Sequence, residues 1–409
     1  MTTQTLKNWN NFRIKDFAKI KGGKRLPKGE FVQDEKTAHP YIRVTDMFSD
    51  RLDTSKIKYI TDPQFEKIKR YIISSDDVYV SNAGTIGLVG KVPKWLSGAN
   101  LTENALKITE MDKSKITQDF LMYFLRSHKG QEQIRARTGG SSQPKLALTR
   151  LADVVIHTPD IFTQKEITDI LTSYDDLIYN NTSRIQILEQ TAQAIYAEWF
   201  VNFRFPGHEK VRMVDSGTDF GKIPEGWSIG KLSDLVNITM GQSPSSDFYN
   251  ESGEGSPFHQ GVTNFDFRFP TTTTFSTGGT RRASAGDILF SVRAPVGRIN
   301  VADRNMIIGR GLSAMRSVSE SQSYLLYNLK NHFATEDLIG GGAIYASVTR
   351  ADLSNFPLVI PDAKIINLFE ELVSPFDGLI FNISHNLSVL RCSRDLLLPK
   401  LVTGEIKIK

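Results

Sequence analysis

The sequence contains a long internal repeat, in which two halves carry the same segments in the same order. Each half opens with a tryptophan and a short apolar alternation, at Trp9 and at Trp227. Residues 77–87 match residues 287–297 at an offset of 210, and from Leu151 onward the halves match at a constant offset of 202. A repeat of this length predicts two similar structural units. The chain length of 409 residues agrees, at about 100–200 residues per domain.

The segment with the constant offset is expected to form a long helix in each half. Its apolar residues recur at three- and four-residue spacings over about five heptads, which is typical of coiled-coil packing. A helix with one narrow apolar face needs a partner, and the equivalent helix of the other half is the natural one. The alternative is two amphipathic helices, each packed on its own globular part. Asn181 is placed to fix the register of the pair. The first seam comprises Ile167, Leu171, Tyr174, Ile178, Asn181, Ile185, Leu188, Ala192, Ile195 and Trp199, and the second comprises Phe369, Val373, Phe376, Ile380, Ile383, Leu387, Leu390, Arg394, Leu397 and Leu401.

The remainder of each half has the pattern of a mixed α+β unit. Short β-branched and aromatic runs bounded by Gly, Pro, Asn and Asp predict strands, and longer stretches with 3-4 apolar spacing predict helices. The expected strands are 41–45, 78–81, 271–275 and 288–292, and the expected helices are 119–134 and 323–332. The boundaries that follow are 1–158 for the first globular domain, 159–205 for the central helix, 206–226 for a linker, 227–360 for the second globular domain and 361–409 for the C-terminal helix.

Charge is distributed unevenly along the chain, although the net charge is only +5. Residues 1–150 hold 27 Lys and Arg against 16 Asp and Glu, and residues 281–316 hold seven Arg against two Asp. Residues 151–200 are acidic, with two basic and eight acidic side chains. The basic blocks favour a polyanionic partner such as DNA, and a solvated basic surface is the alternative. The acidic helix is expected to face protein.

Motifs for catalysis and cofactor binding are missing from the sequence. The stretch 84–91 has the wrong glycine spacing for a phosphate loop, and 309–311 lacks the third glycine of a dinucleotide fingerprint. No Asn-Pro-Pro-Tyr or Asp-Pro-Pro-Tyr loop of an amino-methyltransferase occurs, and a nuclease-like Glu-x-Lys at 405–407 lacks its preceding Pro-Asp strand. Ser81 and Ser291 recur in both halves but lack a Gly-x-Ser-x-Gly elbow. The seven His have no metal-ligand spacing. We therefore expect a binding protein with no catalytic residues, no metal and no cofactor of its own.

The sequence also bears on the compartment. No stretch approaches the roughly 18 continuous apolar residues that a membrane span needs, and the N-terminus lacks the apolar core of a secretory signal. Cys392 is the only cysteine, so an intrachain disulfide cannot form. These features favour a cytoplasmic protein without a membrane partner.

Several segments resemble the specificity subunits of type I restriction-modification systems. Residues 23–29 and 41–46 resemble the opening of a first recognition domain, and 221–227 resembles the start of the second. Residues 189–203 are similar to the end of the central conserved helix, and 396–406 to the C-terminal signature. The usual Pro-rich, Glu-Gln-ending start of each long helix is degenerate, and 158–164 and 360–364 stand in its place. The resemblance covers nearly the whole chain.

This resemblance implies a fold and a division of labour. The expected fold is α+β, with two pseudo-repeated α/β target-recognition domains separated by two long helices packed as an antiparallel coiled coil. The subunit would recognise double-stranded DNA at a bipartite, asymmetric target, with the helices setting the unread gap. Two methylation subunits would bind S-adenosylmethionine and methylate adenine, and restriction subunits would use ATP and Mg²⁺ to translocate and cut.

Candidate contact residues follow from the chemistry of DNA recognition, in which Lys and Arg bind phosphates and Arg, Asn, Gln, Ser or Thr read bases. A solvated or turn-stabilising side chain is the alternative for each. Large aromatic residues at the end of the central helix are candidates for docking methylation subunits, with core packing as the alternative. The DNA-binding candidates are Lys24, Arg25, Lys28, Arg43, Thr45, Asn82, Ser141, Ser142, Gln143 and Lys145 in the first half and Gln242, Ser243, Gln260, Arg281, Arg282, Arg293 and Tyr345 in the second, and the docking candidates are Trp199, Phe200 and Phe203.

Three other functions remain as alternatives. A specificity segment of another type of restriction enzyme would share this architecture. An assembly scaffold without a DNA role would show no sequence preference in binding. A methyltransferase would bind S-adenosylmethionine as an isolated chain.

Overall fold

The computed structural model describes residues 9–49, 51–140, 144–333 and 347–408, together with the backbone of 338–339 and 343–344. The chain divides into two compact units. Unit 1 comprises the residues up to Tyr179 together with those from Ser388 onward, and unit 2 comprises Asn180–Leu387. Each unit therefore contains one globular domain and a part of both long helices.

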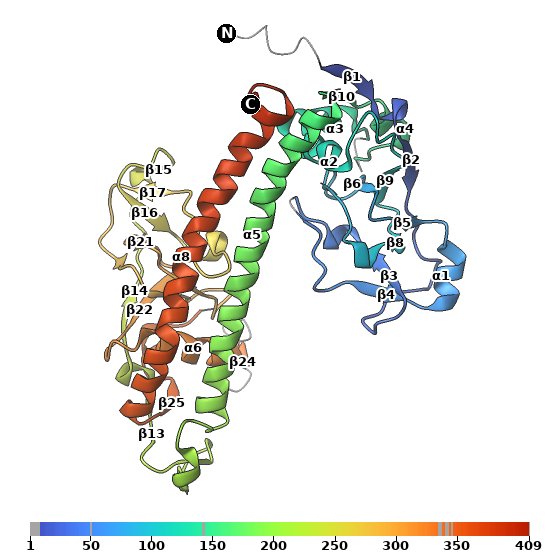
Figure 1. Ribbon diagram of the computed structural model, residues 1–409. Helices are drawn as coiled ribbons and strands as arrows, with labels where there is room; N and C mark the ends of the chain where they lie inside the picture. The colour runs from blue at the N-terminus through green and yellow to red at the C-terminus, as the bar shows by residue number, and fades with distance from the viewer. Residues whose placement is uncertain are drawn as a thin grey trace. The chain divides into compact units, whose positions relative to one another are not determined.

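The two long helices are α5 (Ile161–Tyr196) and α8 (Ala363–Val402) (Figure 1). All positions of both predicted seams are buried or half-buried. In unit 1, Ile167 of α5 belongs to one apolar cluster with Leu401 of α8. In unit 2, Ala192 and Phe369 share another cluster. Because the start of α5 packs on the end of α8 and the reverse holds in unit 2, the helices are antiparallel, as expected.

The first turns of α5 and α8 show which residues stand in place of the usual Pro-rich, Glu-Gln-ending start of each long helix. The carboxylate of Asp160 accepts the backbone N–H of Thr163 at 3.0 Å and that of Asp362 accepts the N–H of Lys364 at 2.8 Å. Aspartate satisfies free N–H groups in the first turn and complements the helix dipole. Both long helices thus begin directly after a Pro-Asp pair.

The described residues of the globular domain of unit 1 form two four-stranded sheets and one two-stranded ribbon. Strand β3 is parallel to β8, and the other pairs are antiparallel. The ribbon joins the first and last strands, β1 and β10, and so closes the domain beside α5. The first sheet has the order β2 (Lys19–Gly22), β9 (Ala105–Thr109), β6 (Val78–Ser81), β7 (Val89–Gly90), the second has the order β4 (Lys58–Ile60), β3 (His39–Ile42), β8 (Ala99–Leu101), β5 (Ile72–Ile73), the ribbon is β1 (Asn10–Arg13) with β10 (Val155–Thr158), and the helices are α1 (Asp62–Ile68), α2 (Gln118–Arg126), α3 (His128–Arg137) and α4 (Leu148–Ala152).

Unit 2 repeats this topology, which confirms the internal repeat. Its first sheet has the same order as that of unit 1, and its second sheet again contains one parallel pair, β16 with β21. Its ribbon again joins the first and last strands of the domain, β13 and β25. The first sheet is β14 (Val236–Met240), β22 (Leu312–Ser317), β19 (Ile288–Ser291), β20 (Ile299–Val301), the second is β15 (Tyr249–Asn250), β17 (Phe275–Ser276), β16 (Ser256–His259), β21 (Met306–Ile308), β18 (Arg282–Ala283), the ribbon is β13 (Ser228–Lys231) with β25 (Pro357–Ile360), the helices are α6 (Gln322–His332) and α7 (Arg350–Ser354), and a short pair is β23 (Leu338–Ile339) with β24 (Ala343–Ile344).

Four local predictions differ from the structure. The stretch 41–45 is a strand only at Tyr41 and Ile42, because Val44–Asp46 form a 3-10 helix in which the Asp46 carboxylate accepts the N–H of Arg43 at 2.8 Å. The stretch 271–275 contributes only its last residue to a strand, because its other residues form an irregular connection. The predicted helix 119–134 is two helices, since Ser127 has extended backbone angles and its hydroxyl accepts the N–H of Gly130 at 3.3 Å. The predicted linker 206–226 contains an antiparallel hairpin of β11 (Met213–Asp215) and β12 (Lys222–Pro224).

Candidate nucleic-acid interface

Three loops of unit 2 converge at one end of its two sheets. They follow β14, follow β16 and connect β21 to β22. Backbone hydrogen bonds join them: the N–H of Gln242 donates to Ile308 O at 3.0 Å, and the N–H of Gly311 donates to Gln260 O at 3.1 Å. The loop after β19 joins the group, since Val292 N–H donates to Gly311 O at 3.0 Å. We call residues 241–243, 260, 292–293 and 309–311 the unit 2 loop cluster.

Glycine is required where these loops touch. A Cβ added at Gly241 would lie 2.2 Å from the carbonyl oxygen of Gly309, and one added at Gly311 would lie 2.7 Å from that of Gln260. Both contacts are with backbone atoms that cannot move independently. A Cβ added at Gly309 would likewise lie 2.8 Å from the Cα of Gln260, so the close approach of the backbones depends on three glycines.

We expect Gly241→Ala to destabilise unit 2 by roughly 1–3 kcal/mol, because an extra methyl group must push two loops apart. Gly261→Ala is the matched control, since a Cβ there has no neighbour within 4 Å. Urea denaturation of both variants checks this prediction. Equal stability of Gly241→Ala and Gly261→Ala would mean that the loops accommodate a side chain.

Polar side chains of the unit 2 loop cluster face outward as a group. Ser243 Oγ donates to Gln260 Oε1 at 2.9 Å and accepts the N–H of Arg310 at 3.2 Å. Arg281 adjoins the cluster, because its carbonyl accepts the N–H of Ile308 at 3.1 Å. The predicted residues Gln242, Gln260, Arg281 and Arg293 are exposed, Ser243 is half-buried, and Arg282 is exposed with Nη1 donating to Ser256 Oγ at 3.0 Å. The sequence analysis missed Arg310, an exposed residue whose position between two glycines in an Arg-rich stretch was its signal.

Unit 1 builds an equivalent cluster on the same backbone bonds. Gly23 N–H donates to Ala105 O at 3.0 Å and Lys24 N–H donates to Leu101 O at 2.8 Å. A Cβ added at Gly23 would lie 2.0 Å from Thr102 O, so a glycine is again required. The equivalent loops place Lys24, Arg25, Lys28 and Thr45 at the surface. We call residues 23–25, 43, 82–83 and 102–104 the unit 1 loop cluster.

Glu103 is a member of this cluster that the sequence analysis missed. Its Oε1 accepts Arg25 Nε at 2.6 Å, and its Oε2 accepts Thr102 Oγ1 at 2.9 Å. Partial burial opposes ionisation of Glu103, but the hydrogen bonds from Arg25 and Thr102 outweigh it, so its pKa lies below the ordinary value. Arg25 is held by a fixed negative charge while most of its side chain, 78%, stays exposed. No sequence motif marks this pair.

Two predicted DNA-binding residues of unit 1 occupy structural positions. The guanidinium of Arg43 turns inward to the buried Asp46, with Nη2 2.5 Å from Oδ1 and Nε 3.1 Å from Oδ2. Asn82 is only 3% exposed, and its backbone bonds to Asn104 O and Leu146 N. Burial of Asn82 argues against the base contact expected of it. Lys145 is exposed, and Ser141, Ser142, Gln143 and Tyr345 lie outside the described residues.

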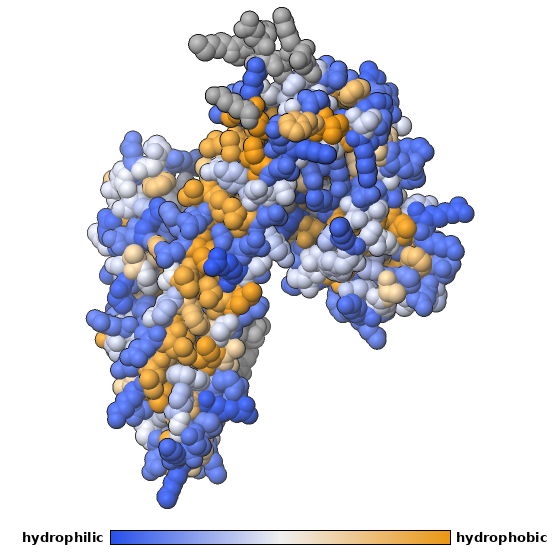
Figure 2. All heavy atoms as spheres, in the orientation of Figure 1, coloured by the Kyte–Doolittle hydropathy of each residue, from blue (hydrophilic) through white to orange (hydrophobic). Residues whose placement is uncertain are grey.

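The three aromatic docking candidates pack inside unit 2. Trp199 lies 5.9 Å from the ring of Phe369 on α8, and Phe200 lies 4.9 Å from Tyr324 on α6. Phe203 contacts Trp227 at 5.5 Å, and Phe200 is 9% exposed. Phe200 therefore cannot serve as a docking surface, and the core-packing alternative describes all three contacts. Exposed apolar residues are found on α8 instead and include Leu368, Leu372 and Leu379 at 44%, 43% and 49% exposure. Figure 2 shows apolar side chains gathered along the long helices.

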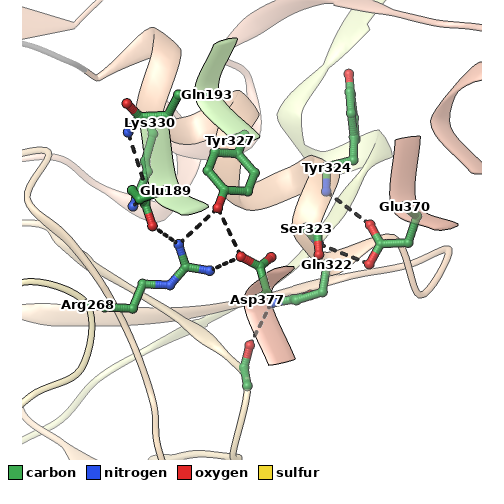
Figure 3. Close-up of polar contacts among 11 residues, drawn as sticks. Glu189, Gln193, Arg268, Gln322, Ser323, Tyr324, Tyr327, Lys330, Glu370 and Asp377 are labelled. Atoms are coloured by element: carbon green, nitrogen blue, oxygen red, sulfur yellow. Dashed lines mark hydrogen bonds and ion pairs between the residues drawn. The ribbon is translucent and has the colours of Figure 1, made fainter. Parts of the chain in front are cut away.

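A buried charge network ties the second domain to both long helices within unit 2 (Figure 3). Arg268, 5% exposed, donates to Glu189 of α5 at 2.6 Å and to Asp377 of α8 at 2.5 Å. Tyr327 of α6 donates to the same Asp377 oxygen at 2.9 Å, and Lys330 pairs with Glu189. Burial lowers the pKa of Lys330 and raises that of Tyr327. The network joins three helices and one loop through four charges.

Unit 1 contains a smaller polar network of the same kind between its domain and the long helices. Asp175, which matches Asp377 at the offset of 202, accepts Tyr123 Oη at 2.8 Å and Arg394 Nη1 at 2.9 Å. Tyr123 lies on α2, the equivalent of α6, so a tyrosine–aspartate bond joins the domain to a long helix in both units. Burial raises the pKa of Tyr123, which keeps its hydroxyl a donor.

The recurring serines hold turns. Ser81 Oγ donates to Thr85 O at 2.6 Å and accepts the N–H of Leu88 at 2.8 Å. Ser291 Oγ donates to Pro295 O at 2.7 Å and accepts the N–H of Arg298 at 2.8 Å. The glycine-containing stretch 84–91 comprises the end of the β6–β7 connection and β7 itself. Among the described residues, no group of His, Cys, Asp and Glu is arranged to hold a metal ion.

None of the helices that the structure describes has the length and hydropathy needed to span a bilayer.

Comparison with known proteins agrees with this architecture. The model of the type I restriction modification DNA specificity domain matches residues 6–190 and 224–385. The MjaX specificity subunit of a type I restriction enzyme from Methanocaldococcus jannaschii is 28% identical, over 92% of this chain and 89% of its own. The HindI specificity subunit from Haemophilus influenzae is 26% identical, over 73% of this chain and 80% of its own. A crystal structure of the type I restriction-modification S subunit from M. genitalium has the same fold, with a TM-score of 0.61, 16% identity and coverage of 98% and 97%.

The two matched segments account for most of the chain and coincide with its two repeats. The protein belongs to the type I restriction-modification DNA specificity family, as its sequence motifs indicated.

Proposed function

We propose that this chain is the DNA sequence-specificity subunit of a type I restriction-modification complex, and that it reads a bipartite, asymmetric target without a catalytic centre of its own. The observation that carries the proposal is the pair of loop clusters. Both are built on the same backbone hydrogen bonds, yet they present different side chains, such as Arg25 and Glu103 in unit 1 and Ser243 and Arg310 in unit 2. Equivalent scaffolds with different polar groups suit two different half-sites.

The proposal assigns chemistry to other subunits. S-adenosylmethionine would bind to methylation subunits, and ATP and Mg²⁺ to restriction subunits, while this chain binds double-stranded DNA in the cytoplasm. Two other functions are an assembly scaffold and a specificity subunit of another restriction type. The scaffold would show no sequence preference in DNA binding, whereas the other specificity subunit would share this architecture.

The experiment is selection of a randomised duplex library by this chain co-expressed with its methylation subunit, read by sequencing. We expect enrichment of a split motif with a fixed gap, since each loop cluster reads its own half-site. An assembled complex that enriches no sequence contradicts DNA reading and favours the scaffold.

The methylation subunit is proposed to dock on the exposed apolar face of α8, in place of the aromatic residues that the sequence favoured. Leu372→Glu is expected to weaken co-purification of the methylation subunit at least about tenfold, because a charge would be buried in the interface. Its melting temperature should stay within a few degrees of wild type, since Leu372 is 43% exposed. Trp199→Ala should do the reverse, lowering the melting temperature through lost core contacts. If Leu372→Glu leaves co-purification of the methylation subunit unchanged, the docking site does not include this face of α8.

A further inference from the structure

Each loop cluster contains a pair of adjoining loops and presents one arginine from that pair. The arginine lies on the first loop in unit 1 and on the second loop in unit 2. In each unit, the first loop of the pair follows the first strand of the first sheet, β2 or β14. The second loop connects the second sheet to the first sheet, from β8 to β9 in unit 1 and from β21 to β22 in unit 2. The backbone bonds Lys24 N–H to Leu101 O and Gln242 N–H to Ile308 O align the loops residue by residue. By this alignment Arg25 corresponds to Ser243, and Glu103 corresponds to Arg310.

The side chains at these two positions exchange roles between the units. In unit 1, the first loop supplies the exposed guanidinium of Arg25, and the second supplies Glu103, which is 26% exposed and lies beneath it. In unit 2, the first loop supplies Ser243, whose hydroxyl is engaged with Gln260 and with the backbone of Arg310, and the second supplies the exposed Arg310. Each loop pair therefore offers one guanidinium at its surface.

The geometry of the Arg25 pair leaves the end of its guanidinium available. Glu103 accepts Nε, which leaves the two Nη groups as a pair of parallel donors on a side chain that is 78% exposed. Two parallel donors match the O6 and N7 acceptors of guanine, the base that arginine reads most often in the major groove. A carboxylate behind the arginine also fixes its orientation, which reduces the rotamer freedom lost on binding.

We infer that each unit reads a guanine from this loop pair, through Arg25 positioned by Glu103 in unit 1 and through Arg310 in unit 2. The inference rests on the proposed function and names the base chemistry of one position in each half-site. Glu103 acts through Arg25 and is a positioning residue. The two guanines would occupy equivalent places in half-sites that otherwise differ.

The test repeats the library selection with single variants of the complex. Arg25→Ala should reduce the preference for guanine at one position of one half-site roughly 10- to 100-fold, and Arg310→Ala should do so at one position of the other half-site. The remaining positions of the motif should keep their preferences. Arg70→Ala and Arg350→Ala are matched controls, because both residues are exposed on the same domains and lie outside the loop clusters. Neither control should change the motif.

Glu103 is tested by its effect on the same base. Glu103→Ala should reduce the preference for guanine at the same position of the motif as Arg25→Ala. The double variant should lose no more of this preference than either single variant, since the two residues act as one unit. A residue needed only for folding would weaken the whole half-site. If Glu103 itself read the base as an acceptor, Glu103→Gln would change which base is preferred, and that outcome would overturn its positioning role.

The outcomes separate the inference from the proposed function. A wild-type split motif that survives Arg25→Ala and Arg310→Ala, with only uniform weakening of binding, would show phosphate contacts and overturn the inference alone. A wild-type complex without any motif would overturn both.

Discussion

Arg268→Ala is expected to lower the free energy of unfolding of unit 2 by about 3–5 kcal/mol, the typical effect of removing one partner of a buried ion pair. The substitution leaves the carboxylates of Glu189 and Asp377 buried without the cation between them, and both side chains are at most one-fifth exposed. Lys330 compensates only Glu189. The measurement is urea denaturation, with hydrogen exchange of α6 amides to assign the loss to unit 2.

The control for Arg268 is another arginine of the same unit. Arg304→Ala removes a guanidinium that is 60% exposed and pairs with the adjacent Asp303, so its effect should stay within about 1 kcal/mol. A quadruple variant that replaces Arg268 and Lys330 with Met, Glu189 with Gln and Asp377 with Asn should recover much of the loss, because it removes all four charges of the network together. Equal effects of Arg268→Ala and Arg304→Ala would show that the network contributes nothing to stability.

Phe369→Ala is expected to destabilise unit 2 by about 3–5 kcal/mol, because it leaves a cavity in the centre of an aromatic cluster. Phe369 is fully buried, and its ring lies 5.2 Å from Phe200, 5.9 Å from Trp199 and 6.0 Å from Tyr196. The cluster joins α5, α6 and α8, so its loss should loosen the domain from the helices. Thermal and urea unfolding measure the effect.

The neighbouring residue provides the control for this substitution. Leu368 is 44% exposed on the same turn of α8, and Leu368→Ala should cost no more than about 1 kcal/mol because little apolar surface leaves the core. A similar loss of stability in both variants would mean that removing any apolar side chain from this turn of α8, and not the aromatic cluster, determines the result.

The sequence predicted the architecture well because an internal repeat indicates two units with the same backbone topology, and heptad spacing indicates which face of a helix is buried. The seam positions of α5 and α8 are buried or half-buried as expected, and the two domains share strand order as the repeat indicated. The seam also included Trp199, which is half-buried and packs against Phe369 in the structure.

The binding residues were harder to predict because their orientation depends on partners far away in sequence. Arg43 and Arg25 are both basic residues that follow a strand of the first domain, but one turns inward to Asp46 and the other lies exposed above Glu103. Glu103 lies 78 residues from Arg25, and no local pattern joins them. Arg268 looked like any other arginine, and only the fold brings it to Glu189 and Asp377. Composition predicts how many polar groups a surface holds, and tertiary contacts decide which of them remain at the surface.

The most direct test of the central claim uses four duplexes, built from the selected motif with both half-sites intact, with either one scrambled, or with both scrambled. Affinity of the complex with its methylation subunit is measured for each at fixed salt, because phosphate contacts alone depend strongly on salt. If each unit recognises its own half-site, scrambling either half-site should weaken DNA binding substantially, and scrambling both should leave only nonspecific affinity. Equal affinity for all four duplexes would contradict the account, and loss on scrambling only one half-site would leave a single reading unit.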